Sequence, residues 1–136
     1  MVFFRSKEAL LDFYDSEHMA DLKTANAVRA ITEEIDPKDK DGAFLRATEA
    51  NAVTLLIREY GRGTDFKCFD SKVLAAGGVH VIQAFFSKDI AEEIQLKGRA
   101  ARQGEDGSFR YVLISMIGKE LDEQLNSLFL FFIAWC

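Results

Sequence analysis

The amino-acid sequence predicts a single α/β domain with a mostly parallel sheet of about five strands flanked by helices. Two observations lead to this fold class. Short apolar runs rich in β-branched residues alternate with segments of helical composition, and the run at 53–57 is almost wholly apolar, as strands covered on both faces are. The chain has 136 residues, 49% of them hydrophobic, which suits one hydrophobic core.

The chain is predicted to begin on a strand. Residues 2–4 form a short apolar run. Ser6 then provides the N-cap of an amphipathic helix whose inward side chains are Ala9, Leu10 and Phe13. This strand and helix are the first unit of the alternation.

The segment that follows is harder to interpret. Residues 27–31 fit a short strand, but residues 21–36 as a whole are ambiguous. Residues 36–42 combine proline, glycine and charged side chains, which favours a solvated turn that breaks whatever precedes it. Residues 43–50 have helical composition, so a helix is expected there before the strand at 53–57.

The second half of the chain continues the pattern. A loop ends in two glycines, and residues 79–86 then form another apolar strand. Ser87 can cap a helix over 88–103, which Gly104 closes. A last strand is predicted over 108–114.

Composition and charge exclude several classes of protein. The net charge of −5 argues against a general nucleic-acid binder, which would carry a basic face. Cys68 and Cys136 suggest neither a disulfide framework nor a zinc site, so a reducing, cytoplasmic compartment is expected. The start of the chain lacks the apolar core of a signal peptide. The apolar run 128–135 is far shorter than the ~20 residues of a spanning helix and is expected to pack against something.

Three polar side chains near the end of the predicted helix share one spacing. Gln95, Arg99 and Arg102 stand at i, i+4 and i+7, which places them on one helix face. Two converging guanidinium groups suggest a phosphate between them. Taken alone, the same arginines also fit a solvated helix end, where they would meet the helix dipole and the acidic residues Glu105 and Asp106.

Two further glycine-containing segments precede this helix in the chain. Gly61-Arg-Gly-Thr-Asp65 directly follows the strand at 53–57, and Gly77-Gly-Val-His-Val-Ile82 opens the next strand. The third segment is Gln95-Leu-Lys-Gly-Arg-Ala-Ala-Arg-Gln-Gly104. In this order and spacing the three segments resemble the second RecA-like lobe of superfamily-2 motor ATPases, and most closely the SecA-type preprotein translocase ATPases. The resemblance implies a RecA-like lobe over 1–118 and a C-terminal helical and apolar tail over 119–136.

The resemblance also implies roles for particular residues. Arg102 would be the arginine finger and Arg99 its companion at the γ-phosphate, whereas Gln95 would orient the helix face that carries them. Asp65 would contact the nucleotide or couple it to the moving lobe. The implied nucleotide-binding set is Gly61, Gly63, Thr64, Asp65, Gln95, Arg99 and Arg102.

The resemblance implies an incomplete ATP site. The sequence contains no G-x-x-x-x-G-K-[ST] phosphate loop and no acidic pair of the D-E-A-D kind, so the lysine and the Mg²⁺ carboxylate must come from a first lobe. The isolated chain is expected to be inactive. ATP would be shared with that lobe, and Mg²⁺ would be held by it. No protein residue of this chain is expected to bind a metal.

Partners and alternative functions follow from the same resemblance. The expected partners are a first RecA-like lobe, in cis or in trans, and a polypeptide substrate. Peripheral association with a membrane is compatible with the resemblance, and nucleic acid is not an expected partner. Two other functions stay open: a catalytically inactive protein-interaction module and a nucleic-acid helicase lobe. Departures from the family pattern are Ala101, where glycine is usual, and Tyr60, where a small residue is usual. His80 lies in an apolar strand and is assigned no role.

Overall fold

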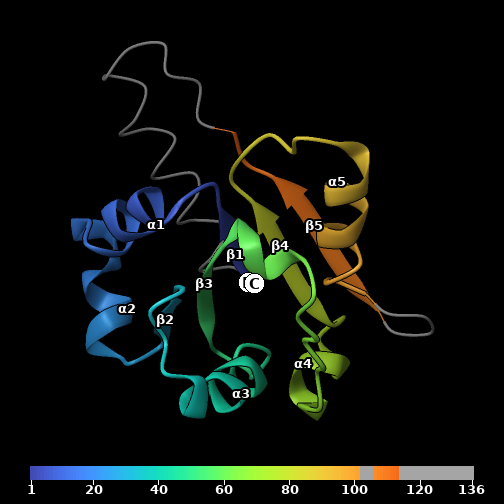
Figure 1. The fold of residues 1–136 in the computed structure, drawn as a ribbon. Coiled ribbons are helices and arrows are strands. Elements are labelled where there is room, and N and C mark those ends of the chain that lie inside the picture. The colour runs from blue at the N-terminus through green and yellow to red at the C-terminus, as the bar shows by residue number, and fades with distance from the viewer. Residues whose placement is uncertain (102–105, 114–136) are drawn as a thin grey trace.

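The predicted α/β fold is confirmed. A computed structural model of the protein describes residues 1–101 and 106–113, and it contains one five-stranded sheet (Figure 1). All strand pairings among these residues are parallel. In spatial order the strands are β2 (Val28–Ile31), β3 (Val53–Ile57), β1 (Val2–Phe4), β4 (Val79–Gln83) and β5 (Gly107–Tyr111).

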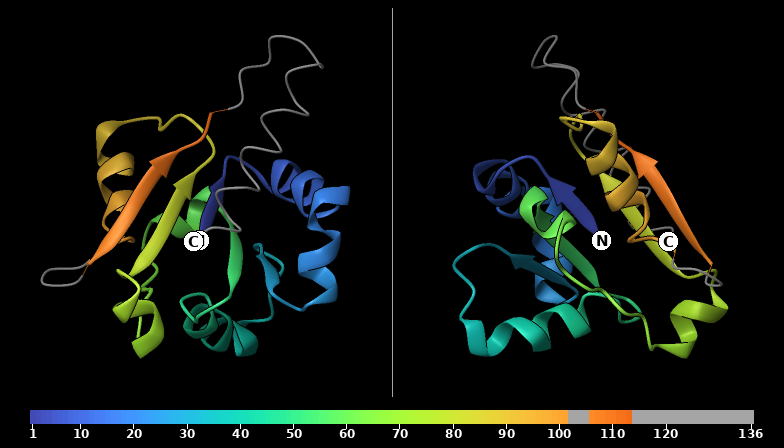
Figure 2. Two further views of the ribbon diagram at one scale, coloured as in Figure 1. Left: turned by 180° about the vertical axis from the view of Figure 1, so that it is seen from behind. Right: turned by 45° about the vertical axis from the view of Figure 1, so that its right-hand side comes forward.

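Helices connect successive strands, as a parallel sheet requires. Helix α1 contacts β1, β2 and β3, whereas α5 contacts β4. Figures 1 and 2 show α1 and α2 beside the β2 end of the sheet and α5 beside the β5 end. The helices and short 3-10 turns are α1 (Lys7–Tyr14), η1 (Glu17–Met19), α2 (Ala20–Thr24), α3 (Pro37–Arg46), η2 (Arg58–Gly61), α4 (Ser71–Ala75) and α5 (Ile90–Lys97).

The centre of the core is formed by the three middle strands. Phe3 of β1 and Leu55 and Leu56 of β3 are fully buried, as is Val81 of β4. These strands are apolar on both faces because helices cover both sides of a parallel sheet. Strand β1 lies between β3 and β4, and the loops that follow these two strands both leave the sheet at its carboxyl edge, where parallel sheets bind ligands.

The first strand and helix agree with the sequence-based expectation. Ser6 is the N-cap of α1, and its hydroxyl accepts a hydrogen bond from Ala9 N–H at 3.4 Å. Leu10 is fully buried against the sheet. The ambiguous segment 27–31 is indeed a strand, β2.

The expectation for residues 36–42 was wrong. This segment is the first part of helix α3 and not a solvated turn. The Asp36 carboxylate accepts a hydrogen bond from Lys38 N–H at 2.8 Å, and Pro37 occupies the first helical turn, where its missing N–H leaves no bond unmade. Residues that would break a helix in its interior therefore start one here.

The predicted strand 79–86 and helix 88–103 are both shorter in the structure. Strand β4 ends at Gln83, and the N-cap of α5 is Asp89, not Ser87. The Ser87 hydroxyl instead accepts a hydrogen bond from Gln83 Nε2 at 2.8 Å. Helix α5 ends at Lys97 with Gly98 as its C-cap, so Arg99 follows the helix.

Parts of the sequence-based expectation lie outside the described residues. These are Arg102, Gly104, the end of the predicted strand 108–114 and the tail 119–136. Within the described ranges, no helix has the length and apolar character needed to cross a bilayer.

The start of α3 gives a first testable prediction. Asp36→Ala removes the side-chain acceptor of the N-cap and is expected to lower the free energy of unfolding by about 1 kcal/mol, measured by urea denaturation. Asp41→Ala, at an exposed position within the same helix, serves as the control. Equal effects of the two substitutions would contradict the capping role of Asp36.

Candidate functional site

The loop after β3 lies at the carboxyl edge of the sheet. Strand β3 passes directly into the short turn η2, and the segment Gly61–Asp65, here called the glycine loop, follows. Gly63 has φ +67°, a conformation that favours glycine, and a Cβ there would meet no atom within 4 Å. The glycine loop is thus tight in its backbone and open to its surroundings at Gly63.

One side of this region is anchored in the core by aromatic rings. The Tyr60 ring packs edge-on against Phe44 of α3, with centroids 5.2 Å apart, and its hydroxyl donates to the Thr32 carbonyl at 2.8 Å. Burial raises the pKa of Tyr60. Phe66, directly after the glycine loop, packs edge-on against Phe3 and Phe44. The large side chain at Tyr60 therefore fills the core.

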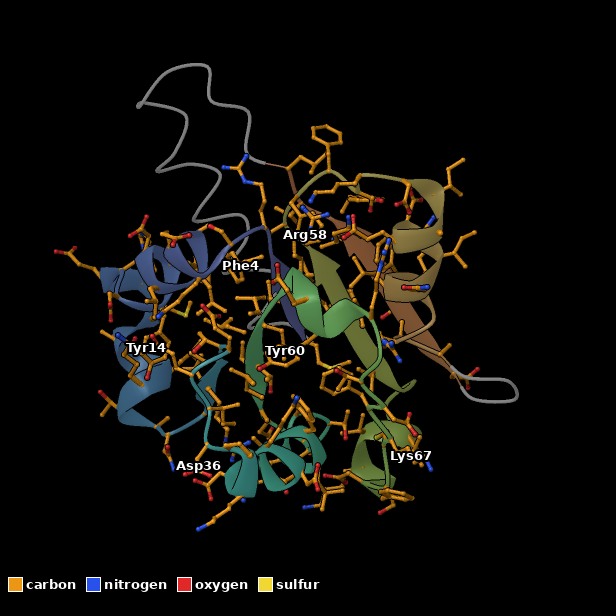
Figure 3. The ribbon with its side chains drawn as sticks, in the orientation of Figure 1. Phe4, Tyr14, Asp36, Arg58, Tyr60 and Lys67 are labelled. Carbon is orange, nitrogen blue, oxygen red and sulfur yellow. The ribbon has the colours of Figure 1, made fainter. Side chains whose placement is uncertain are left out.

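The other side of this region is joined to α5 by a buried ion pair. Arg58 Nη2 donates to both carboxylate oxygens of Glu92, at 2.6 and 2.7 Å, and Arg58 Nε donates at 3.1 Å. The side chains are 14% and 6% exposed. The Arg58 guanidinium also lies over the Phe85 ring, 5.1 Å from its centroid. Figure 3 shows Arg58 above the strands, near the loop that leads to α5.

Glu92 has a second partner besides Arg58. Its Oε2 accepts a hydrogen bond from Lys88 N–H at 2.8 Å, so the carboxylate also holds the chain just before α5. Burial by itself raises the pKa of Glu92, but the hydrogen bonds from Arg58 and Lys88 outweigh burial and keep that pKa below its ordinary value. Glu92 is therefore ionised near neutral pH in the folded protein.

Gly61 makes the closest contact between the glycine loop and α5. A Cβ on Gly61 would lie 2.7 Å from Leu96 Cδ2, so only glycine fits without a shift of the leucine. The Gly61 carbonyl accepts two hydrogen bonds from Arg99, at 3.3 Å from Nε and 3.0 Å from Nη2. Burial lowers the pKa of Arg99. The two motifs recognised in the sequence thus touch each other directly.

The contacts with the loop region use a different series of residues from the predicted one. Glu92, Leu96 and Arg99 follow each other at i, i+4 and i+7 and face Arg58 and Gly61. Of the predicted series, Gln95 lies on the exposed side of α5, Arg99 lies beyond the helix end, and Arg102 lies outside the described residues.

Sequence reasoning missed Arg58 and Glu92. A signal was present, because Glu92 stands four residues before the buried Leu96, on the inward stripe of the helix. An acidic residue on that stripe requires a cationic partner inside the protein. Arg58, the first residue after a buried strand, is such a cation.

A second, exposed ion pair lies beside the buried one. Arg62 Nη2 approaches both carboxylate oxygens of Asp89 at 3.3 Å. Both side chains are about half exposed, so solvent screens this pair and its contribution to stability is small. The Asp89 carboxylate also accepts a hydrogen bond from Glu92 N–H at 2.7 Å, which starts α5.

The remaining predicted residues face a separate cavity. Gly63, Thr64 and Asp65 line a space of about 470 Å³ between the glycine loop and α3. The other lining residues are Lys40, Asp41, Phe44, Leu45, Lys67 and Phe69. The structure therefore brings Gly61 and Arg99 together, and it places Gly63, Thr64 and Asp65 toward α3.

Comparisons with known proteins bear on the family and the fold of the chain. No protein-family model matches the chain. Over 115 residues the chain is 33% identical to protein translocase subunit SecA 2 of Nitrosospira multiformis. This alignment covers 84% of the chain and 16% of that protein. The chain is a relative of SecA. It is also 37% identical over 93 residues to SecA 3 of Magnetococcus marinus, covering 68% of the chain and 13% of that protein.

A solved structure also has a similar fold. The crystal structure of the C-terminal part of the Fun30 ATPase domain matches with a TM-score of 0.55 and 17% identity, covering 93% of the chain and 38% of that structure. This match shows the fold alone, an α/β lobe of the RecA-like kind. With the SecA relatives, it confirms the recognition of a SecA-type second RecA-like lobe. The chain spans less than a fifth of the length of these SecA proteins.

The contact between Gly61 and Leu96 can be tested by adding a single methyl group. Gly61→Ala is expected to lower the free energy of unfolding by about 1–3 kcal/mol, because the Leu96 side chain must shift. Gly42→Ala is the control: it lies within α3, its Cβ would be 3.6 Å from the nearest Arg46 atom, and it should stabilise by about 0.5–1 kcal/mol. Destabilisation by Gly42→Ala alone would contradict this account.

The depressed pKa of Glu92 predicts a pH dependence. The stability that its charge contributes is fully present above the ordinary carboxyl pKa of 4.5 and is lost as pH falls through the lower folded value. The difference in unfolding free energy between the wild type and Glu92→Gln should therefore be largest near neutral pH and shrink in acid. Urea denaturation over a pH series measures it.

Glu93→Gln is the control for this series, because Glu93 pairs with Lys97 at the exposed surface of the same helix. Its effect should be small at every pH, since solvent screens an exposed pair. A Glu92→Gln difference that stays constant down to strong acid would rule out ionised Glu92 as its source.

Proposed function

We propose that the chain supplies one wall of an ATP site in a SecA-type protein-translocation motor, the other wall coming from a first RecA-like lobe. The observation that carries the proposal is the direct hydrogen bonding of Arg99 to Gly61, which joins the two predicted nucleotide-facing segments at the carboxyl edge of the sheet. The relation to translocase subunits supplies the motor context.

The residues at this edge fit a nucleotide phosphate. The Arg99 guanidinium is half-buried, and burial in a low-dielectric position strengthens its attraction for an anion. Gly63 leaves open space beside Thr64 and Asp65, which can offer a hydroxyl and a carboxylate to the nucleotide or to the opposing lobe. When bound, ATP would supply the phosphoanhydride bond that is hydrolysed, with Mg²⁺ held by the first lobe.

The proposed role of the arginines is electrostatic. Arg102 would act as the arginine finger, and Arg99, just beyond the end of α5, would stand beside it at the γ-phosphate. A planar and permanently charged fork matches the charge spread over a transferring phosphoryl group, and such an arginine contributes about 10³ to 10⁵ in rate. Neither arginine activates the attacking water, so the chain needs its partner lobe for catalysis.

A second candidate function is that of a protein-interaction module without ATPase activity. Three large apolar side chains on or next to α5 are strongly exposed: Phe86 at 78%, Ile90 at 77% and Ile94 at 62%. Exposed apolar groups that lie close together are typical of surfaces that bind another protein. In this case the glycine loop would keep its structure without a nucleotide.

Reconstitution with a SecA first lobe separates the two functions. The chain alone should show no ATP hydrolysis above background. With the first lobe added, turnover should appear, and Arg102→Ala should lower kcat by about 10³-fold or more, with Arg99→Ala having a weaker effect in the same direction. A coupled phosphate-release assay measures both.

Arg29→Ala is the matched arginine control. Arg29 lies on the edge strand β2, where it donates to the Arg46 carbonyl at 3.1 Å, far in the sheet order from β4 and α5. Its substitution should leave kcat unchanged. If Arg99→Ala and Arg102→Ala also leave a reconstituted rate unchanged, the arginine roles are wrong. If no turnover appears with a first lobe that binds the chain, the interaction module is the better function.

A further inference from the structure

We propose that Arg58 and Glu92 are positioning residues that hold Arg99 in place for the nucleotide. This inference rests on the proposed function and extends it to two residues that have no assigned role there. Neither residue lines the cavity between the glycine loop and α3. They act by fixing the exit of β3, which leads to Gly61, against helix α5, whose C-terminal end leads to Arg99.

The contacts between α5 and the turn after β3 show how Arg58 and Glu92 can affect the position of Arg99. Glu92 and Leu96 lie on one face of α5, and Arg99 follows just beyond the end of the helix. Each of the three residues makes a contact with the turn after β3. Glu92 contacts Arg58 at the start of that turn, and Leu96 and Arg99 contact Gly61 at its end. A displacement of α5 along its axis would break all of these contacts together, so the ion pair sets the register of the others.

The ion pair between Arg58 and Glu92 is buried, and each of its members has a further partner, so the pair can hold α5 in one position. The Glu92 carboxylate is bound by the Arg58 fork and by Lys88 N–H, and the Arg58 guanidinium lies over the Phe85 ring. A bidentate pair has one strongly preferred geometry, unlike apolar contacts, which allow sliding. Arg58 and Glu92 therefore define where the end of α5 lies.

Apolar residues could keep the fold, but they would not keep this position. A buried ion pair can often be replaced by apolar side chains of similar volume without loss of stability. The pair Arg58→Met with Glu92→Leu should therefore stay folded. Its Arg99 should no longer be held at the Gly61 carbonyl, because nothing then fixes the register of α5.

The first experiment uses the full chain without nucleotide or partner. Hydrogen exchange of the Arg99 side-chain Nε–H, assigned by its loss in Arg99→Lys, is followed by ¹H–¹⁵N NMR. Exchange should be at least about tenfold faster in Glu92→Gln and in the apolar double variant, each still folded by its amide spectrum. Glu93→Gln, which breaks the exposed pair with Lys97, should leave it unchanged.

The second experiment repeats these variants in the reconstituted ATPase. Glu92→Gln and the apolar double variant should lower kcat about tenfold or more without raising KM for ATP, because the arginine acts on the transition state. Glu93→Gln should behave as the wild type.

The outcomes distinguish this inference from the proposed function. Arg99 Nε–H exchange that stays as slow as in the wild type, in a folded Glu92→Gln and in the folded double variant, overturns the positioning role. If exchange is fast in both variants but the wild-type reconstitution shows no ATP hydrolysis, the proposed function is wrong and the positioning role is kept. Fast exchange with an unchanged kcat shows that Arg99 needs no positioning, which also overturns the inference.

Discussion

The close approach of the β3 exit to helix α5 is the constraint on which the rest of the site depends. Gly61 allows it, because any Cβ would collide with Leu96. The same approach buries Arg58 and Glu92, and an unpaired charge in that position would cost several kcal/mol. Since each charge satisfies the other, the two elements are held at one distance and in one register.

The same constraint gives the half-buried guanidinium of Arg99 a partner within its own lobe. The Gly61 carbonyl accepts both of its hydrogen bonds, so neither group is left unsatisfied in the absence of a nucleotide. The opposite side of the region is fixed by Tyr60 and Phe66, which pack on Phe44 of α3. The glycine loop thus connects the region packed on α3 with the region packed on α5, and at its centre a Cβ on Gly63 would meet no atom within 4 Å.

The turn after β3 carries a local concentration of positive side chains. The chain is acidic overall, with a net charge of −5, yet three arginines gather around one turn at the carboxyl edge of the sheet. Two of them, Arg58 and Arg62, are neutralised by acidic residues of α5 and its cap. Within residues 1–101 and 106–113, Arg99 donates its hydrogen bonds to the Gly61 carbonyl, a neutral group that does not cancel the positive charge of the guanidinium.

The sequence by itself determined the order of strands along the chain and the location of the glycine loop. Strands such as 53–57 can be predicted because an apolar, β-branched run is a local feature of the sequence. The N-cap at Ser6 is local too, because its hydrogen bond joins residues that are three positions apart. The start of α3 was misread because proline and aspartate favour turns and helix starts alike, and the packing of Phe44 decides between them.

Only the tertiary structure decided which side chains meet. Arg58 and Glu92 are 34 residues apart, and Arg99 and Gly61 are 38 apart, so their pairing depends on how α5 packs on the sheet. Helical spacing alone suggested Gln95, Arg99 and Arg102, whereas α5 ends before Arg99 and uses Glu92 and Leu96 instead. Periodicity reports which residues share a helix face, but the partner of that face is set by packing.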